Sequence, residues 1–218
     1  MVLKDEDFRR AIERGDAAGV RVALQWRPDF ATRTIRWYLN QFNDSDPLHF
    51  VADCVGNGWL TNESDGEIAT LLLEHGAAIE GSEGRESPLV ASASLGAVRA
   101  CKVLIEAGAN LEATSIYEAR ALHWAAWTGA AATVELLIAR GARIERRDAE
   151  FGATPLFWAV HGLGPAGAKP KNRQLDAARL LLNAGADAHT VNKHGQSVRD
   201  LAESFPDQGM FALLSEYP

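Results

Sequence analysis

The stretch ALHWAAWTG at residues 121–129, with ELL at 135–137, decides how this chain folds. Its alanines recur on one helical face, where small side chains let a neighbouring helix approach closely. The leucines that follow have helical spacing and form the apolar stripe of a second helix. A single helix pair cannot bury its own apolar face, so this unit requires similar units beside it.

The same pattern returns along the chain in a constant order. Segments that end in Gly-Ala place glycines at positions 76, 108, 141 and 185, in steps of 32, 33 and 44. A second marker lies upstream of each one: DPLH at 46–49, SPLV at 87–90, RALH at 120–123 and TPLF at 154–157. Two markers that stay in phase indicate a repeat architecture.

Each marker has a structural reason. Ser87 and Thr154 can accept a hydrogen bond from a free amide of the first helical turn. The proline after each of them stands where a missing N–H costs nothing. The glycine of each Gly-Ala pair supplies the left-handed conformation that ends the second helix. The markers therefore predict where each helix pair begins and ends.

This pattern resembles the ankyrin repeat, whose unit is a β-hairpin turn followed by two antiparallel helices. The resemblance covers nearly the whole chain and implies an all-α solenoid of stacked helix pairs, in a single domain at residues 1–218. It predicts about six repeats, of which the outer two are caps. Their expected bounds are 1–42 for the N-terminal cap, 43–80, 81–112, 113–147 and 148–190 for the repeats, and 191–218 for the C-terminal cap.

Three segments depart from the family pattern. Insertions at roughly 55–66 and 162–173 fall between the two helices of their repeats, and the stretch 33–45 replaces a standard hairpin. Long loops in compact domains are often functional. A neutral insertion at a tolerant surface turn explains each insertion equally well.

Composition and charge narrow the classes of partner. The net charge is −7 and the pI is about 5.4, so phosphate backbones and anionic membranes repel the chain. We expect no signal peptide and no membrane span. The two cysteines, Cys54 and Cys101, form neither a disulfide framework nor a zinc spacing. We expect a cytoplasmic monomer that binds neither nucleic acid nor membrane.

One glycine-rich segment raises the question of nucleotide binding. Residues 162–167 read GLGPAG and match G-x-G-x-x-G. A dinucleotide fingerprint requires a strand before it and a helix directly after it. Here the preceding segment is predicted to be a helix, and Pro165 removes an amide that phosphate would use. A flexible surface loop is the favoured interpretation.

No catalytic or metal-binding constellation is visible. No histidine pair has HExxH spacing, none joins a cysteine in a zinc pattern, and no G-x-S-x-G elbow occurs. The resemblance implies that His49 and His123 bond neighbouring hairpin backbone as structural residues. We therefore expect no catalytic residue, no metal and no cofactor, and predict that the chain is not an enzyme.

The aromatic residues give the clearest indication of function, because six tryptophans are many for a fold packed with alanine and leucine. In ankyrin proteins the hairpin tips and the exposed side of the first helices form the concave, partner-facing surface. We expect Trp124 and Trp158 to pack between repeats. The residues that the resemblance assigns to partner binding are Ile116, Tyr117, Trp127, Thr128, Glu150, Phe151 and His161.

The sequence therefore predicts a protein–protein interaction module. Large aromatic side chains on a rigid surface are typical of binding hot spots. The acidic balance favours a partner with a basic or mixed-charge surface. Two alternatives stay open: an inhibitor or immunity-type protein that occludes an enzyme, and a small-molecule or nucleotide binder that uses the 162–173 loop.

Overall fold

In the computed structural model of the chain, the helices begin and end where the sequence markers predict. The Ser87 hydroxyl accepts a hydrogen bond from the amide of Val90 at 3.3 Å, and the Thr154 hydroxyl accepts one from Phe157 at 3.5 Å. The glycines of the four Gly-Ala pairs are left-handed, with φ of 89°, 91°, 86° and 97° at positions 76, 108, 141 and 185. Both predicted signals are confirmed.

The structure describes residues 4–164, 173–205 and 208–217. Residues 1–110 and residues 111–218 form two compact units, each of which is described by itself. The predicted single domain and the predicted repeat bounds stay predictions.

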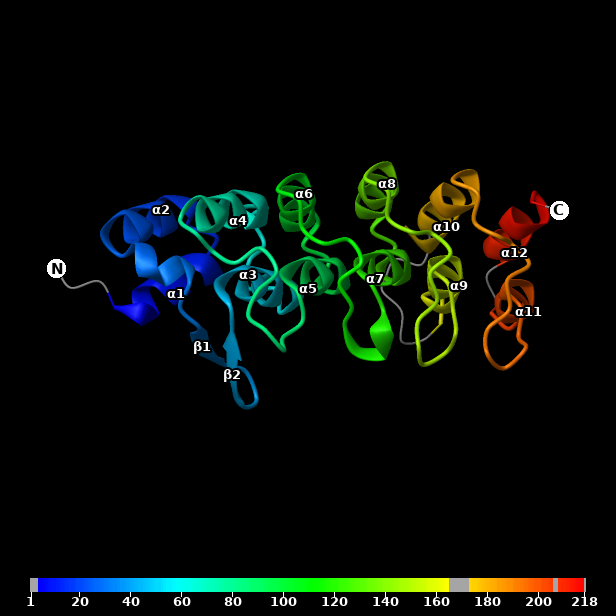
Figure 1. Cartoon of the computed structure of the whole chain (residues 1–218), viewed down its shortest axis with the longest axis horizontal. Helices are drawn as coiled ribbons and strands as arrows, with labels where there is room; N and C mark the ends of the chain where they lie inside the picture. Colours follow the sequence, from blue (N-terminus) through cyan, green and yellow to red (C-terminus); the bar gives the residue numbers. More distant parts are fainter. Residues whose placement is uncertain (1–3, 165–172, 206–207, 218) are drawn as a thin grey trace. The chain divides into compact units, whose positions relative to one another are not determined.

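The first unit stacks three helix pairs (Figure 1). Its elements are α1 (Asp5–Glu13), α2 (Ala17–Trp26), the 3-10 turn η1 (Pro28–Ala31), β1 (Ile35–Tyr38), β2 (Phe42–Ser45), α3 (Pro47–Gly56), α4 (Asp65–Glu74), α5 (Pro88–Leu95) and α6 (Val98–Glu106). Helices α2, α4 and α6 form one row, and α1, α3 and α5 form a second. The core between them holds fully buried apolar side chains such as Ile12, Leu24, Phe50, Ile68 and Leu104.

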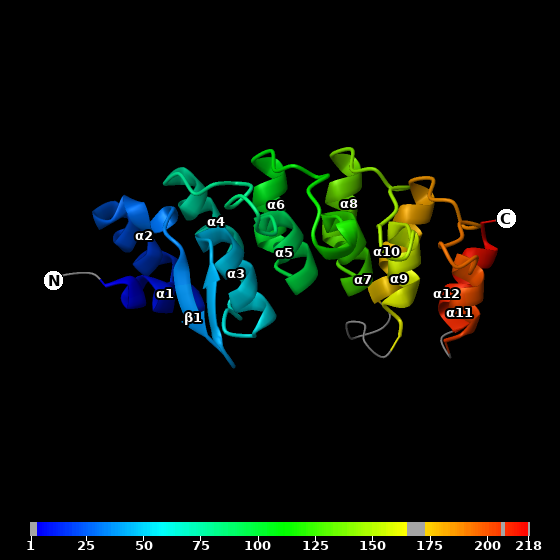
Figure 2. The ribbon, with the colours of Figure 1, turned by 60° about the horizontal axis from the view of Figure 1, so that its bottom comes forward.

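The stretch 33–45 is a regular hairpin, whereas the sequence indicated an irregular replacement for one. Strands β1 and β2 pair antiparallel, with Ile35 opposite Ser45 and Tyr38 opposite Phe42, and extend away from the helices (Figure 2). Burial alternates along β1, because Trp37 packs 6.0 Å from the ring of Phe50 while Tyr38 faces solvent. This alternation gives the hairpin an apolar face that packs on α3.

The predicted insertion at 55–66 is shorter in the structure, because α3 extends to Gly56 and α4 begins at Asp65. The connection is tied down: the Asn62 amide donates to the Gly15 carbonyl at 3.1 Å, and the Ser64 hydroxyl donates to it at 2.9 Å. Gly15 lies in the turn between α1 and α2, so this connection stabilises the contact between neighbouring helix pairs.

The second unit repeats the arrangement. Its elements are η2 (Ile116–Glu118), α7 (Ala121–Thr128), α8 (Ala131–Ala139), α9 (Pro155–His161), α10 (Arg173–Asn183), α11 (Val198–Glu203) and α12 (Gln208–Ser215). Helix α9 packs between α7 and α11, and α8 packs on α10. The loops before α7, α9 and α11 all project on the same side (Figure 1). Most of the predicted 162–173 insertion, residues 165–172, lies outside the described residues.

Candidate functional site

Three neighbouring hairpin tips of the second unit are joined through their backbones. The amide of Ala149 donates to the Tyr117 carbonyl at 2.7 Å, and the amide of Lys193 donates to the Phe151 carbonyl at 2.9 Å. These two bonds fix the register of the tips at 115–120, 148–153 and 192–197. Tyr117 and Phe151 are thereby brought together, with ring centroids 5.7 Å apart.

The first of these tips has an unusual backbone. Tyr117 and Glu118 are left-handed, with φ of 64° and 53°, whereas the next two tips use Gly152 and Gly195 at their left-handed positions. A residue other than glycine pays roughly 1–2 kcal/mol for this conformation. Such strain often marks a functional position. The Tyr117 side chain, 45% exposed, is held at the tip in spite of this cost.

Behind the tips, three tryptophans of α7 and α9 meet nearly at right angles. The rings of Trp124 and Trp158 lie 4.9 Å apart at 75°, and those of Trp124 and Trp127 lie 5.9 Å apart at 87°. Their positions on α7 differ by three residues, so Trp124 and Trp127 share one helical face. The three indoles form an aromatic corner.

The tips and the corner enclose a groove of about 430 Å³, which we call the aromatic groove. Polar side chains of the third tip, Asn192, His194 and Gln196, belong to its lining. Its full lining is Tyr117, Trp124, Trp127, Phe151, Ala153, Phe157, Trp158, His161, Asn192, His194, Gln196 and Leu201. Ligand sites have this character, a mostly apolar wall with a few polar groups.

A buried carboxylate supports the groove from behind. One oxygen of Asp148 accepts from the Phe151 amide at 2.6 Å. The other accepts from the Ala153 amide at 3.1 Å and from the indole N–H of Trp158 at 2.9 Å. Asp148 therefore orients both the second tip and the Trp158 ring.

The histidine beneath the groove is a structural residue, as predicted. His123 is fully buried; its Nδ1 accepts from the Arg120 amide at 3.2 Å, and its Nε2 bonds the Arg146 carbonyl at 3.1 Å. Burial lowers the pKa of His123 to about 4, so the ring is neutral at pH 7. His49 differs, because its Nε2 lies 3.7 Å from an oxygen of Asp53 on its own helix.

His161 ends α9 at the margin of the groove. The residue is exposed, yet the groups around its ring remove enough water to lower its pKa below the ordinary value. At pH 7 it therefore adds little positive charge to the groove.

The structure brings four of the seven predicted partner-binding residues into this groove: Tyr117, Trp127, Phe151 and His161. The other three lie outside its lining. Ile116 and Glu150 are exposed on the tips, and the Thr128 hydroxyl donates to the Trp124 carbonyl of its own helix at 3.0 Å.

Two residues that were assigned to packing also line the groove. Trp158 is only 8% exposed and Trp124 is half-buried, so they do pack between repeats as predicted. Each also presents part of its ring to the groove. Asn192, His194 and Gln196 were missed altogether, because nothing in the sequence showed that the third tip reaches the same groove.

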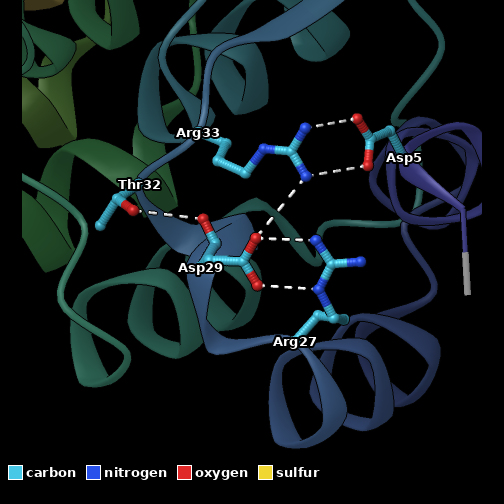
Figure 3. A network of polar contacts seen from close by, with 5 residues as sticks. All are labelled: Asp5, Arg27, Asp29, Thr32 and Arg33. Carbon is cyan, nitrogen blue, oxygen red and sulfur yellow. Dashed lines mark hydrogen bonds and ion pairs between the residues drawn. The ribbon is translucent and has the colours of Figure 1, made fainter.

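The first unit contains a second, smaller aromatic site beside α1. Its hollow measures about 190 Å³ and is lined largely by charged residues. Here the Arg27 guanidinium lies 4.7 Å over the Phe30 ring. It also bonds both oxygens of Asp29, at 2.9 and 2.8 Å (Figure 3). Arg33 bonds both oxygens of Asp5 in the same network. The hydrogen bond from Arg27 lowers the pKa of Asp29.

Within the part of the chain that the structure describes, no group of three or more His, Cys, Asp or Glu side chains is arranged to hold a metal ion. Over the same residues, no helix is long and apolar enough to cross a membrane. Gly162, the first glycine of the G-x-G-x-x-G match, directly follows helix α9, where a nucleotide fingerprint would have a strand.

Family models match most of the second half of the chain and part of the first. A model of three ankyrin repeats matches residues 59–148, and a single ankyrin repeat matches residues 151–193. Together these matches include every residue that lines the aromatic groove except His194, Gln196 and Leu201.

Relatives of known name match about half of the chain. Ankyrin repeat and SOCS box protein 6 of Homo sapiens is 34% identical over 118 residues, which are 53% of this chain and 25% of that protein. Putative palmitoyltransferase ZDHHC13 of Danio rerio is 28% identical over 126 residues, 58% of this chain and 18% of that protein. The chain thus spans a quarter or less of these relatives. The matched repeats and the stacked helix pairs confirm the predicted fold class, and the chain belongs to the ankyrin-repeat family.

Proposed function

We propose that this chain binds a partner protein in its aromatic groove. Ankyrin repeats are protein-interaction modules and are typically non-catalytic, so a binding role is the general expectation for the family. The observation that carries the specific proposal is the groove itself: three tryptophans at right angles, closed by Tyr117 and Phe151. Tryptophan and tyrosine dominate the energy of protein interfaces.

The backbone at Tyr117 supports this proposal independently. A glycine at this tip would relieve the left-handed strain, as glycines do at the two neighbouring tips. Retaining a large aromatic residue there costs folding stability. A binding contribution from the side chain offsets that cost.

The acidic balance defines the partner further. With a net charge of −7, the chain attracts a basic or mixed-charge surface, and its association rate should fall as salt is added. We infer a cytoplasmic monomer without catalytic activity. Scaffold and inhibitor functions would use the same groove, and the partner's identity decides between them.

The test compares the wild-type chain with a Tyr117→Ala/Trp127→Ala variant in affinity capture from native lysate, quantified by mass spectrometry. At least one captured protein should be reduced about 30-fold or more by the double substitution, since hot-spot residues contribute about 2 kcal/mol or more. That protein, once purified, should bind the wild type directly in a titration.

The matched control is Trp26→Ala, which removes a 78% exposed tryptophan from the first unit. It should capture the same proteins as the wild type. All variants must keep the wild-type circular dichroism spectrum. Equal capture by the wild type and the double variant would refute the proposal.

A further inference from the structure

The aromatic groove offers π faces but few hydrogen-bond donors. The indole N–H of Trp124 donates to the Ser115 hydroxyl at 2.8 Å, and that of Trp158 donates to Asp148 at 2.9 Å. An indole has a single donor, so both rings have used theirs inside the protein. An indole whose N–H is already bonded offers an occupant mainly its electron-rich π system, which attracts a cation or an apolar group.

Charge around the groove favours the cation. The buried carboxylate of Asp148 lies at the edge of the Trp158 ring, and its bond to the indole N–H pushes electron density onto that ring. The Glu118 and Glu150 side chains are exposed beside Tyr117 and Phe151, without a bonded partner in the described chain. Their carboxylates are free to meet a charged occupant.

The positive groups near the groove offset the negative charge of these carboxylates only in part. His123 and His161 have lowered pKa values and are neutral at pH 7. The Arg147 guanidinium is bonded to the carbonyls of Gly152 and Val191 and to Thr190. Lys193 and the exposed His194 lie at the far end, on the third tip.

The chain itself shows how such a site is filled. In the first unit the Arg27 guanidinium lies over the Phe30 ring. Its edge bonds the Asp29 carboxylate (Figure 3). Arg33 approaches the same ring at 5.9 Å. Over the described residues these are the only two cation–ring contacts, so the tryptophan faces of the groove hold no cation of their own.

Building on the proposed function, we infer that the aromatic groove receives an arginine side chain of the partner protein. The guanidinium stacks in the corner of Trp124, Trp127 and Trp158, and its N–H groups pair with the exposed carboxylates of Glu118 and Glu150 on the neighbouring tips. Arginine fits better than lysine, because a guanidinium is planar and weakly hydrated, whereas an ammonium needs several acceptors that the indole corner does not offer.

The test uses short peptide probes and the indole N–H signals of the full ¹⁵N-labelled chain. The probe acetyl-Ala-Arg-Ala-amide is compared with the same peptide carrying citrulline, which has the shape of arginine but no charge. The arginine probe should shift the signals of Trp124, Trp127 and Trp158 and should bind at least fivefold more tightly than the citrulline probe.

A variant of Glu118 and Glu150 tests the role of the two tip carboxylates without changing the tryptophans. Glu118→Gln/Glu150→Gln should weaken the arginine probe about threefold or more and leave the citrulline probe unchanged. The control Glu135→Gln neutralises an exposed residue of α8, outside the groove lining, and should change neither.

Equal binding of the arginine and citrulline probes, or absence of groove binding by either, would overturn the inference. So would tighter binding of the matched lysine or trimethyllysine probe. A norleucine probe separates this failure from failure of the proposed function. If norleucine binds the groove as well as arginine does, the groove remains an apolar docking site, and only the inference of a cationic occupant is wrong.

Discussion

The site around Phe30, Arg27 and Arg33 in the first unit and the aromatic groove of the second unit both place aromatic rings beside carboxylates. They differ in whether arginines of the same chain cover the rings. Phe30 is 2% exposed, stacked on Phe8 at 4.8 Å, and covered by two arginines of the same chain. In the groove, Trp124 and Trp158 have their indole N–H groups bonded inside the protein, and no arginine or lysine of the described residues covers the three tryptophans. A ring that the chain covers itself contributes to folding, whereas a ring left open is available for binding.

This contrast predicts opposite consequences for two aromatic truncations. Phe30→Ala should lower the free energy of unfolding by about 3–5 kcal/mol, because it removes a buried ring and leaves a cavity. Trp127→Ala should cost only about 1–2 kcal/mol, because its ring is only partly buried, yet it should reduce partner binding strongly. Urea denaturation followed by circular dichroism measures the stability change; equal destabilisation by the two variants would abolish the distinction.

The carboxylates of the two sites should differ as well. Asp148→Ala should destabilise the second unit by about 3–4 kcal/mol, because it leaves the amides of Phe151 and Ala153 and the indole N–H of Trp158 without an acceptor. Asp29→Ala should change the unfolding midpoint little, because its carboxylate is about half exposed to water and its ion pairs lie at the surface. The same denaturation experiment checks both; a neutral Asp148→Ala would mean that water replaces the carboxylate.

The two units should also respond differently to acid. Burial holds the pKa of His123 near 4 in the folded chain, below its ordinary value of about 6.5. Between these values the unfolded chain binds a proton that the folded chain does not, so stability falls as pH is lowered from 6.5 to 4. The full loss is about 3 kcal/mol.

The acid response is measured by urea denaturation at a series of pH values, with His123→Gln as the control that should flatten the dependence. The exposed Arg27–Asp29 pair of the first unit should add little to the slope. A slope that survives the His123→Gln substitution would assign the acid sensitivity to another group.

The smallest expected effect concerns the strained tip. Glu118→Gly should stabilise the fold by about 0.5–1 kcal/mol, because relief of the left-handed strain exceeds the entropy cost of glycine. It should at the same time weaken binding of an arginine probe. Thermal unfolding and the probe titration test the two effects; a loss of stability would show that the Glu118 side chain supports the tip.

Much of the fold follows from the sequence alone. The caps at Ser87 and Thr154, the left-handed glycines of the Gly-Ala pairs and the helix pairs between them are local signals, set by residues within one or two turns of each other. The resemblance to the ankyrin repeat assigned Tyr117, Trp127, Phe151 and His161 to one surface, because it identifies which positions are tips and which are first helices. The bond of His123 to the neighbouring hairpin was implied by the resemblance to the ankyrin repeat.

Only the tertiary structure decided how the groove is completed. The indole N–H of Trp158 meets a carboxylate ten positions earlier in the chain, and the third tip reaches the groove through the bond from Lys193 to Phe151. The contact of Arg27 and Arg33 with Phe30 likewise depends on side-chain conformations that no periodicity encodes. The sequence determines which backbone each residue occupies, because that depends on near neighbours. Packing between hairpins and helices determines where its side chain points, and therefore which aromatic faces stay open for a partner.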